Sequence, residues 1–341
     1  MYCLCVLANN PILGHYFRMQ RTTFTGLICP LIILQTLHFH QAVACGFDEP
    51  AEPGRGNSQT TKLVTEEQVK ELLKKHQNES VSKKIDIFSK LFLGTRYLTE
   101  AFGEGSDGIY DQDPLYRFDA FDCTTYVETV LALSHSRDIE NFKSIINTIR
   151  YADGIVSFPF RNHFPEIDWI PNNTDAGYIF DTTAEVAGFH PVHLAETSID
   201  KRSWYQHLTI RSIQVPGADQ MEKEKLLTDL RAEGAGYEIK DVQTQYLHLR
   251  TMENNPDIFK RFPAAAVINV VRPNWLPNAN YGTTLNISHQ AIVIRKNGKV
   301  FIRHANSHDK KVAESLLIDE LKTYANSKTI KGINVLALRS H

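Results

Sequence analysis

Residues 287–304 read ISHQAIVIRKNGKVFIRH, two apolar runs separated by an Asn-Gly pair. An Asn-Gly pair between alternating runs is typical of a β-hairpin with a two-residue turn, and such a turn fixes which residues face one another. His289 then faces Asn306, and His304 is its diagonal neighbour, about 7–8 Å away between backbones. Alternation along a strand places these three side chains on one face. The hairpin therefore predicts an imidazole beside a polar side chain that orients it.

Upstream of this hairpin most signals are helical. Thr65 to Gln68 fit a capping box, which predicts that a helix starts at Thr65. Apolar residues at helical spacing predict further helices at Val81–Leu93, Ile139–Tyr151, Met221–Arg231 and Val242–Met252. The last two would belong to a helical insertion at 219–260. Helices followed by strands predict a fold of the α+β class.

The first 45 residues have the features of an export signal. Arg18 and Arg21 precede the apolar stretch 27–34, and small residues at 42–44 form a cleavage site. We expect residues 1–44 to be a signal peptide, and a true start at Met19 would give it more usual proportions.

The mature chain would then begin with a flexible tether at 45–62, and residues 63–341 would form a single catalytic domain. The protein is expected to be exported, either to the periplasm or out of the cell. The sequence around Cys45 also fits a lipoprotein that is anchored to the membrane through this residue.

Composition limits the partners. The chain has 341 residues, of which 42% are hydrophobic and 22% charged, and its formal net charge is -2. Nothing is basic enough for a phosphate-binding surface, so nucleic acid is not expected as a partner. No apolar run after residue 45 is long enough to cross a bilayer, and we expect a monomer without an integral membrane span.

Cys123 would be the only cysteine in the folded body after removal of the signal. It lies where a loop becomes a helix, and the helix dipole and the unpaired N–H groups at that position favour a thiolate. Cys123 is therefore a candidate nucleophile, although a buried and unreactive cysteine is the plain alternative.

A thiolate, an imidazole and a group that orients the imidazole make the arrangement of cysteine acyl transfer. Cys123 would attack a carbonyl carbon, and His289 would take its proton and later protonate the leaving amine. Either His304 or Asn306 would hold the required tautomer. Two ordinary, half-exposed strand histidines are the alternative for His289 and His304.

The block Asp122-Cys123-Thr124-Thr125-Tyr126-Val127-Glu128, with Ser288-His289 and Arg303-His304 on strands, resembles the NlpC/P60 superfamily of papain-like cell-wall hydrolases. More narrowly, it is similar to the DUF1460 family of N-acetylmuramoyl-L-alanine amidases. The resemblance spans roughly residues 85 to 310. Further matching pieces are Gly94-Thr95-Arg96-Tyr97, Ile149-Arg150-Tyr151, Arg161-Asn162-His163-Phe164 and Asp168-Trp169-Ile170. Arg96 departs from the family pattern, in which a proline is expected.

The resemblance implies a papain-like NlpC/P60 core, in which the helix that carries Cys123 packs on an antiparallel sheet that carries the histidines. It implies a Cys123–His289–His304 triad without a metal or another cofactor. The substrate would be a peptidoglycan fragment, cleaved at the amide between N-acetylmuramic acid, or its anhydro form, and L-Ala.

Six more residues would line the cleft under this interpretation. Tyr97, Asp122 and Thr124 would border the oxyanion. Arg161, His163 and Trp169 would bind substrate, with Arg161 against a carboxylate and Trp169 as a stacking wall. Each residue also has a structural explanation, such as an ion pair for Arg161 or a core position for Trp169.

Three other functions fit parts of the sequence. The same triad would serve an endopeptidase that cuts within the stem peptide, between γ-D-Glu and the diamino acid. A zinc amidase would use His190 and His193 with other histidines. A binding module without catalytic activity would leave Cys123 unreactive.

Overall fold

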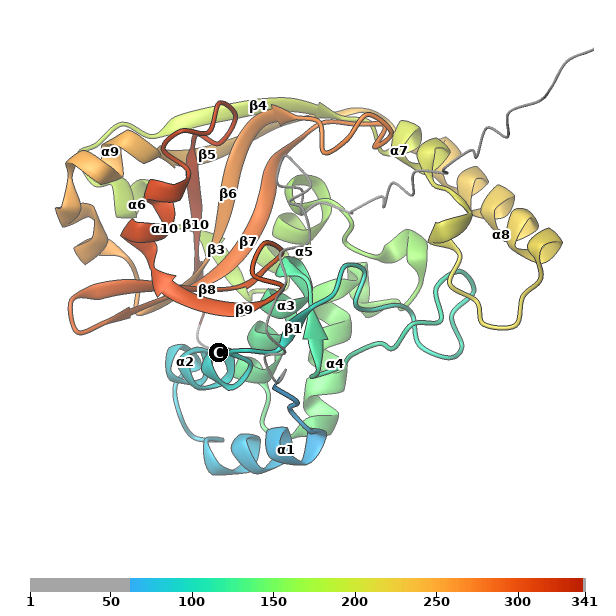
Figure 1. The fold of residues 1–341 in the computed structure, drawn as a ribbon, viewed down its shortest axis with the longest axis horizontal. Coiled ribbons are helices and arrows are strands. Elements are labelled where there is room, and N and C mark those ends of the chain that lie inside the picture. The colour runs from blue at the N-terminus through green and yellow to red at the C-terminus, as the bar shows by residue number, and fades with distance from the viewer. Residues whose placement is uncertain (1–61, 340–341) are drawn as a thin grey trace, which may run out of the picture. The chain divides into compact units, whose positions relative to one another are not determined.

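The computed structural model describes residues 62–339, which form a mixed α+β fold around one large, mostly antiparallel sheet (Figure 1). The expected fold class is confirmed. The predicted signal peptide at 1–44 and the tether up to residue 61 lie outside the described residues. Within 62–339, no helix has both the length and the apolar character needed to cross a bilayer.

The sheet has ten strands in the order β2-β1-β9-β8-β7-β6-β10-β5-β4, and β3 pairs with β10. Only the β1–β2 pair is parallel. The strands are β1 (Arg96–Tyr97), β2 (Ala120–Phe121), β3 (Ile179–Asp181), β4 (His193–Ile199), β5 (Lys240–His248), β6 (Ala265–Trp275), β7 (Leu285–Lys296), β8 (Lys299–Asn306), β9 (Lys311–Leu316) and β10 (Gly332–Leu338).

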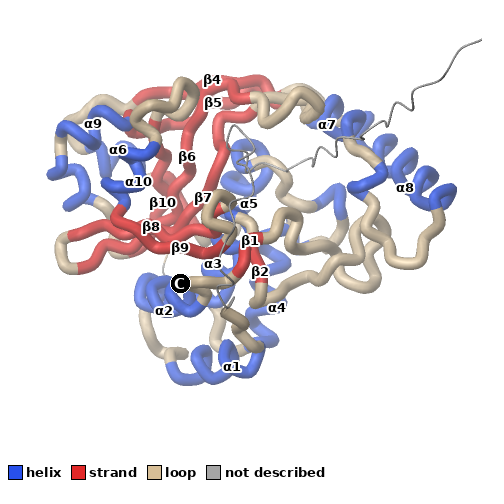
Figure 2. The backbone as a smooth tube through the Cα atoms, in the orientation of Figure 1, coloured by secondary structure: helices blue, strands red, loops and turns tan. Residues whose placement is uncertain are grey.

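Helices cover both faces of the sheet, as the tube in Figure 2 shows. The helices are α1 (Glu66–Lys75), α2 (Val81–Leu91), α3 (Cys123–His135), α4 (Ile139–Arg150), α5 (Ile170–Asp175), α6 (Thr183–Ala187), α7 (Lys201–His207), α8 (Gln220–Glu233), α9 (Leu249–Asn254) and α10 (Leu317–Thr323). The predicted capping box of α1 is present, because Thr65 and Gln68 cap each other. The predictions of α2, α4 and α8 are confirmed within a few residues.

The β7–β8 hairpin has the predicted turn and register. Asn297 and Gly298 both have positive φ, 52° and 75°, as a tight hairpin turn requires. Val293 pairs with Ile302, as the two-residue turn predicts. The paired stretch ends at Ile292, so β7 continues past its last partner on β8 while it stays paired with β6.

The two faces of β7 belong to different hydrophobic cores. Ile292 and Ile294 pack with residues of α2, α3 and α4, whereas Ala291 and Val293 pack with residues of α9 and α10. Because both faces are covered, every residue of β7 up to Ile294 is buried. The strand that carries His289 is therefore a central element of the molecule.

The predicted helix at Val242–Met252 is wrong. Most of this stretch is the strand β5, which pairs with β4 and β10, and only Leu249–Asn254 is helical. Thr244 and Tyr246 are buried while Gln243 and Gln245 are exposed, so the burial has the period of two that defines a strand. The segment 219–260 is thus part helix and part central sheet.

The stretch 158–183 contains several short regular elements. It holds a short 3-10 turn at Phe158–Phe160, a π-helical segment at Pro165–Trp169, the helix α5 and the strand β3. π-helical segments inside other helices are often found at functional sites. This one leads directly to the candidate site.

Candidate functional site

Cys123 is the first residue of α3, as the sequence predicts. Asp122 caps the helix: its Oδ1 accepts the Thr125 N–H at 2.8 Å, and Thr125 Oγ1 accepts the Asp122 N–H at 2.9 Å. The Cys123 side chain is buried, and its Sγ lies 3.9 Å from Thr124 Oγ1.

His289 and His304 are joined directly. His289 Nε2 lies 2.7 Å from His304 Nδ1, and the two rings stand nearly perpendicular, at 75°. Both side chains are buried, 3% and 2% exposed. Burial and the neighbouring ring lower the pKa of His289 well below its ordinary value, which keeps the imidazole neutral at neutral pH. A neutral imidazole is the form that can act as a base.

Glu320 of α10 extends this pair on the far side. Its Oε1 lies 4.0 Å from His304 Nε2, and its two oxygens accept hydroxyl hydrogen bonds from Ser315 and Tyr324. Burial and the Glu320 charge raise the pKa of Tyr324 well above its ordinary value, so this hydroxyl stays protonated and donates. We call His289, His304 and Glu320 the histidine chain.

The charge of Glu320 favours one direction of the histidine chain. At 4.0 Å the carboxylate is beyond hydrogen-bond distance, but its negative charge favours a hydrogen on His304 Nε2, toward Glu320. His304 Nδ1 is then an acceptor and His289 Nε2 the donor. In this arrangement Nδ1 is the basic atom of His289. Burial lowers the pKa of His304 and the Glu320 charge acts against that shift.

Asn306, the other predicted orienting residue, is used elsewhere. Its Oδ1 accepts the N–H groups of His308 and Asp309 at 2.8 and 3.1 Å, which shapes the turn from β8 to β9. The structure therefore brings His304 to His289 and leaves Asn306 in a turn.

Tyr97 lies beside the start of α3. It pairs with Phe121 across β1 and β2, directly before Asp122. Burial and the charge of Asp122 raise the pKa of Tyr97, so its hydroxyl is a hydrogen-bond donor at neutral pH. Burial likewise raises the pKa of Asp122 itself.

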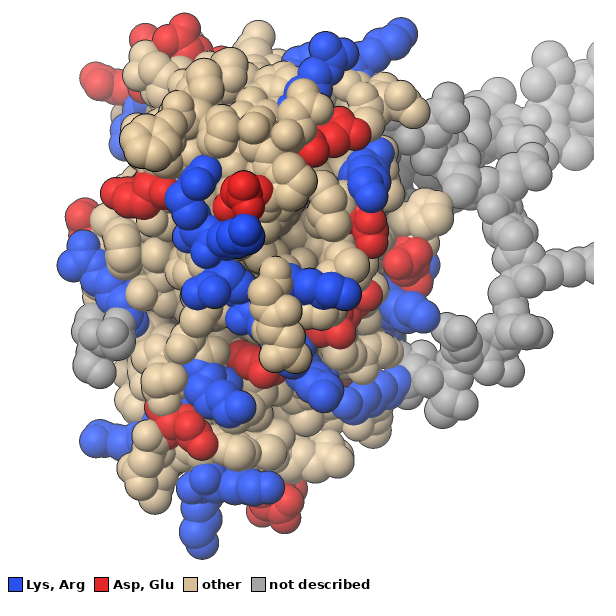
Figure 3. Space-filling view, turned by 90° about the vertical axis from the view of Figure 1, so that its left-hand side faces the viewer, with Lys and Arg blue, Asp and Glu red and all other residues tan. Residues whose placement is uncertain are grey.

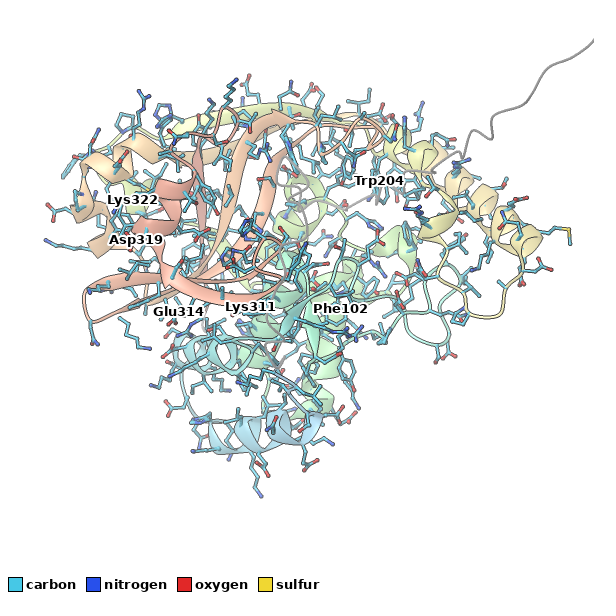
Figure 4. The ribbon with its side chains drawn as sticks, in the orientation of Figure 1. Phe102, Trp204, Lys311, Glu314, Asp319 and Lys322 are labelled. Carbon is cyan, nitrogen blue, oxygen red and sulfur yellow. The ribbon has the colours of Figure 1, made fainter. Side chains whose placement is uncertain are left out.

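A cavity opens beside the start of α3. The residues that line it include Asp122, Thr124, Glu128, Arg150, Arg161, Asn162, His163, Trp169, Gln290, Phe102 and Trp204. Figure 4 labels Phe102 and Trp204, which come from opposite sides of this region. The cavity thus combines aromatic walls with several charged side chains.

The predicted substrate-binding residues reach this cavity in different ways. Arg161 donates to Asp111 at 3.0 Å, so part of its guanidinium is already paired. His163 Nε2 lies 2.8 Å from the Phe158 carbonyl, and its ring packs on Trp204. Burial and two nearby cations lower the pKa of His163 well below its ordinary value. Trp169 lines the cavity but is 1% exposed and belongs to the core around α3.

Several residues that line the cavity were not predicted from the sequence to belong to the site. Glu128 and Arg150 form a buried ion pair at 2.8 Å in the wall of the cavity. Glu100 has an unusual φ of 54° and lines the cavity together with Asp111 and Asp122. Glu128 had a readable signal, because an acidic residue on the apolar side of a helix usually has a buried partner.

No group of three or more potential metal ligands occurs within residues 62–339. His193, from the sequence pattern that suggested zinc, packs its ring against Tyr246 and His248 on the neighbouring strand. Figure 3 shows the face on the side of α9 and α10, where Lys and Arg are interspersed with Asp and Glu.

A family model described as N-acetylmuramoyl-L-alanine amidase-like (AmiA-like) matches residues 87–330. The chain is also similar to the solved structure of protein LPG0564 from Legionella pneumophila str. Philadelphia 1, described as DUF1460. The two are 35% identical over 81% of this chain and 95% of that chain, with a TM-score of 0.77. No curated protein matches the chain.

Two solved structures resemble the chain more distantly. An N-acetylmuramoyl-L-alanine amidase from Bacteroides uniformis is 22% identical over 76% of this chain and 99% of that one, with a TM-score of 0.49. A putative xylanase from Bacteroides fragilis is 24% identical over 73% and 99%, with a TM-score of 0.51. At 24% identity, the likeness to the Bacteroides fragilis protein is one of fold alone.

Proposed function

Because this chain belongs to the N-acetylmuramoyl-L-alanine amidase-like family, we propose that it is a cysteine hydrolase of peptidoglycan fragments. It cleaves the amide between L-Ala and N-acetylmuramic acid or its anhydro form. The resemblance inferred from the sequence is confirmed at the level of the family, and the chain is an enzyme of this kind.

The mechanism assigns the nucleophilic attack to Cys123 and the proton transfers to His289, while His304 holds the His289 tautomer. Reduced Cys123 gives its proton to His289 Nδ1, and the thiolate attacks the lactyl carbonyl carbon of the muramic acid. The N–H groups at the start of α3 and the Tyr97 hydroxyl stabilise the oxyanion. His289 then protonates the leaving nitrogen of L-Ala, and water hydrolyses the thioester.

The observation that supports this proposal most directly is the 2.7 Å contact between His289 and His304, with Glu320 behind it. It supplies a neutral base with a defined basic atom. Cys123 begins a helix on one face of the sheet, and alternation from Ala291 assigns His289 to the other face. The reaction requires them to meet in the part of β7 that carries His289 and extends beyond its last pair with β8.

The proposal includes a papain-like NlpC/P60 core. It is supported by the packing of α3, which starts with the nucleophile, on β7 and β8, which carry the histidines. We also propose that the protein acts outside the cytoplasmic membrane, in the periplasm or beyond it. The signal peptide at 1–44 and the lipid anchor at Cys45 are part of this proposal.

The test is hydrolysis of defined muropeptides by the full chain in the presence of a reductant, with the products identified by mass spectrometry. Release of an intact stem peptide and the free muramic acid sugar supports the proposal. Release of a dipeptide would instead identify an endopeptidase, and loss of activity with a chelator would point to a metal.

The matched variant is Cys123→Ala, which removes only the sulfur. We expect it to abolish hydrolysis, at least 1000-fold below the native enzyme, because no other group replaces a covalent nucleophile. An unchanged melting temperature under reducing conditions serves as the folding control. Full activity in this variant would contradict the nucleophile assignment.

A further inference from the structure

A row of side-chain hydrogen bonds runs through the sheet from the cavity to β3. Gln290 Nε2 donates to Asn269 Oδ1 at 3.0 Å, and Asn269 Nδ2 donates to Asn334 Oδ1 at 2.9 Å. Asn334 Nδ2 donates to the Asp181 carboxylate at 2.7 Å. These four residues, which we call the amide row, lie on the neighbouring strands β7, β6, β10 and β3. The three amides are 2% exposed or less.

Asp181 determines which way every amide in the row points, and Thr183 Oγ1 supports it by accepting from the same Asn334 Nδ2 at 3.0 Å. A carboxylate only accepts, so Asn334 must turn its NH₂ group toward Asp181 and its oxygen toward Asn269. The NH₂ group of Asn269 then fills that position, and its own oxygen faces Gln290. Gln290 must therefore turn its NH₂ group into the row, which leaves Oε1 as its other end.

Gln290 Oε1 is a buried acceptor without a partner among residues 62–339. Gln290 is 1% exposed, and it lines the cavity together with Asp122 and Thr124 at the start of α3. A buried acceptor without a hydrogen bond is costly, whereas a ligand that brings an N–H group to it removes this cost. The cavity thus contains an acceptor whose direction is fixed from outside the cavity.

We propose that Gln290 Oε1 accepts an amide N–H of the substrate, and that Asp181 keeps it an acceptor through the amide row. Gln290 is a specificity residue and takes no part in bond making. This inference rests on the proposed function, since a muropeptide offers two sources of such a group. One is the acetamido N–H of the sugar, and the other is the N–H between L-Ala and the next residue of the stem.

Asp181→Asn tests the direction of the row without touching the cavity. The second oxygen of Asp181 accepts the Thr183 N–H at 2.8 Å. An asparagine has one oxygen, and Thr183 would occupy it, so its NH₂ group would face Asn334. The Thr183 hydroxyl, which accepts from Asn334 Nδ2 in the wild type, would donate to the Asn334 oxygen instead. Each amide would then turn over in sequence, and Gln290 would present NH₂ to the cavity instead of oxygen.

The experiment measures kcat and KM of the full chain on three substrates: the native fragment, an analogue with an ester in place of the L-Ala amide to the next residue, and an analogue with acetoxy in place of acetamido. The wild-type enzyme should lose about 10- to 100-fold in kcat/KM, through KM, on one of the two analogues. The analogue with the lower kcat/KM identifies which N–H group of the substrate Gln290 accepts.

Asp181→Asn and Gln290→Met should raise KM for the native fragment by a similar factor and keep kcat within a few-fold of the wild-type value. Both variants should also cleave the native fragment and the two analogues with similar kcat/KM. Asp175→Asn makes the same chemical change on the exposed last residue of α5 and should behave as wild type. Melting curves control for folding of each variant.

Two outcomes overturn the inference alone: wild-type enzyme that cleaves all three substrates equally well, or an Asp181→Asn variant that discriminates as the wild type does. If the wild-type enzyme leaves the muramoyl–L-Ala bond intact, the proposed function fails and this inference fails with it. These results are distinguishable, because the first two need an active enzyme.

Discussion

Two neighbouring residues of β7 start two polar chains that run in opposite directions. His289 leads through His304 to Glu320 on α10, whereas Gln290 leads along the amide row to Asp181 on β3. Both chains end at a carboxylate, and both direct an acceptor back toward the site. The members of the histidine chain can gain and lose protons, but amides cannot. The histidine chain therefore suits a proton transfer, and the amide row suits recognition of a hydrogen-bond donor on the substrate.

Among the changes that distinguish the two chains, His304→Ala should have the largest effect. It removes the acceptor that holds the His289 tautomer, so kcat should fall about 100- to 1000-fold while KM changes little. Steady-state kinetics on a muropeptide measure this split. For Asp181→Asn the amide row predicts the opposite, a change in KM with little change in kcat. A change in KM for the His304 variant would therefore remove the distinction between the two chains.

Glu166 lies where the two chains begin. Its Oε1 accepts the N–H groups of Asn286 and Ile287, just before the bulge at Ser288 from which His289 and Gln290 extend. Burial raises the pKa of Glu166 to about 7. The folded protein therefore holds a proton on this carboxyl between pH 4.5 and 7, and the unfolded chain does not.

Stability from this group is present below pH 4.5 and is lost as the pH rises through 7. Glu166→Gln keeps the accepting oxygen but cannot ionise, so it should be more stable than the wild type at pH 8, by up to about 3 kcal/mol, with little difference at pH 4.5. Urea unfolding at the two pH values measures this. Equal pH dependence in both proteins would show that Glu166 is ionised in the fold.

Glu320→Gln should have the smallest effect, a fall of about 10-fold in kcat, because its NH₂ group disfavours the working tautomer of His304 across a 4.0 Å gap. Asp319→Asn is the matched control, since Asp319 is the preceding residue of α10 and pairs with Lys322 at the surface (Figure 4). Equal activity of the two variants would show that Glu320 does not affect the tautomer of His304, and the histidine chain would then consist of His289 and His304 alone.

The sequence predicted those parts of the site that depend on local structure. The Asn-Gly turn defined the β7–β8 register and so the meeting of His289 with His304, and the change from loop to helix at Cys123 indicated the start of α3. The amide row was not predictable in this way, because Asn269 and Asn334 lie 65 residues apart and meet only through the pairing of β6 with β10.

β5 was missed for a related reason. Val242 and Leu249 also fit helical spacing, and strand pairing with the distant β4 and β10 decided the outcome. The residues of the cavity wall, such as Glu128 and Arg150, come from different helices, and no local pattern shows that they pair.

The burial of β7 on both faces has a consequence for how the enzyme opens. A strand enclosed by two cores and paired along most of its length exchanges its amide hydrogens only when the whole domain unfolds. Any fluctuation that admits a substrate must therefore occur in the loops around the cavity while the imidazole stays in place. Heat should then inactivate the enzyme in the same transition that unfolds it.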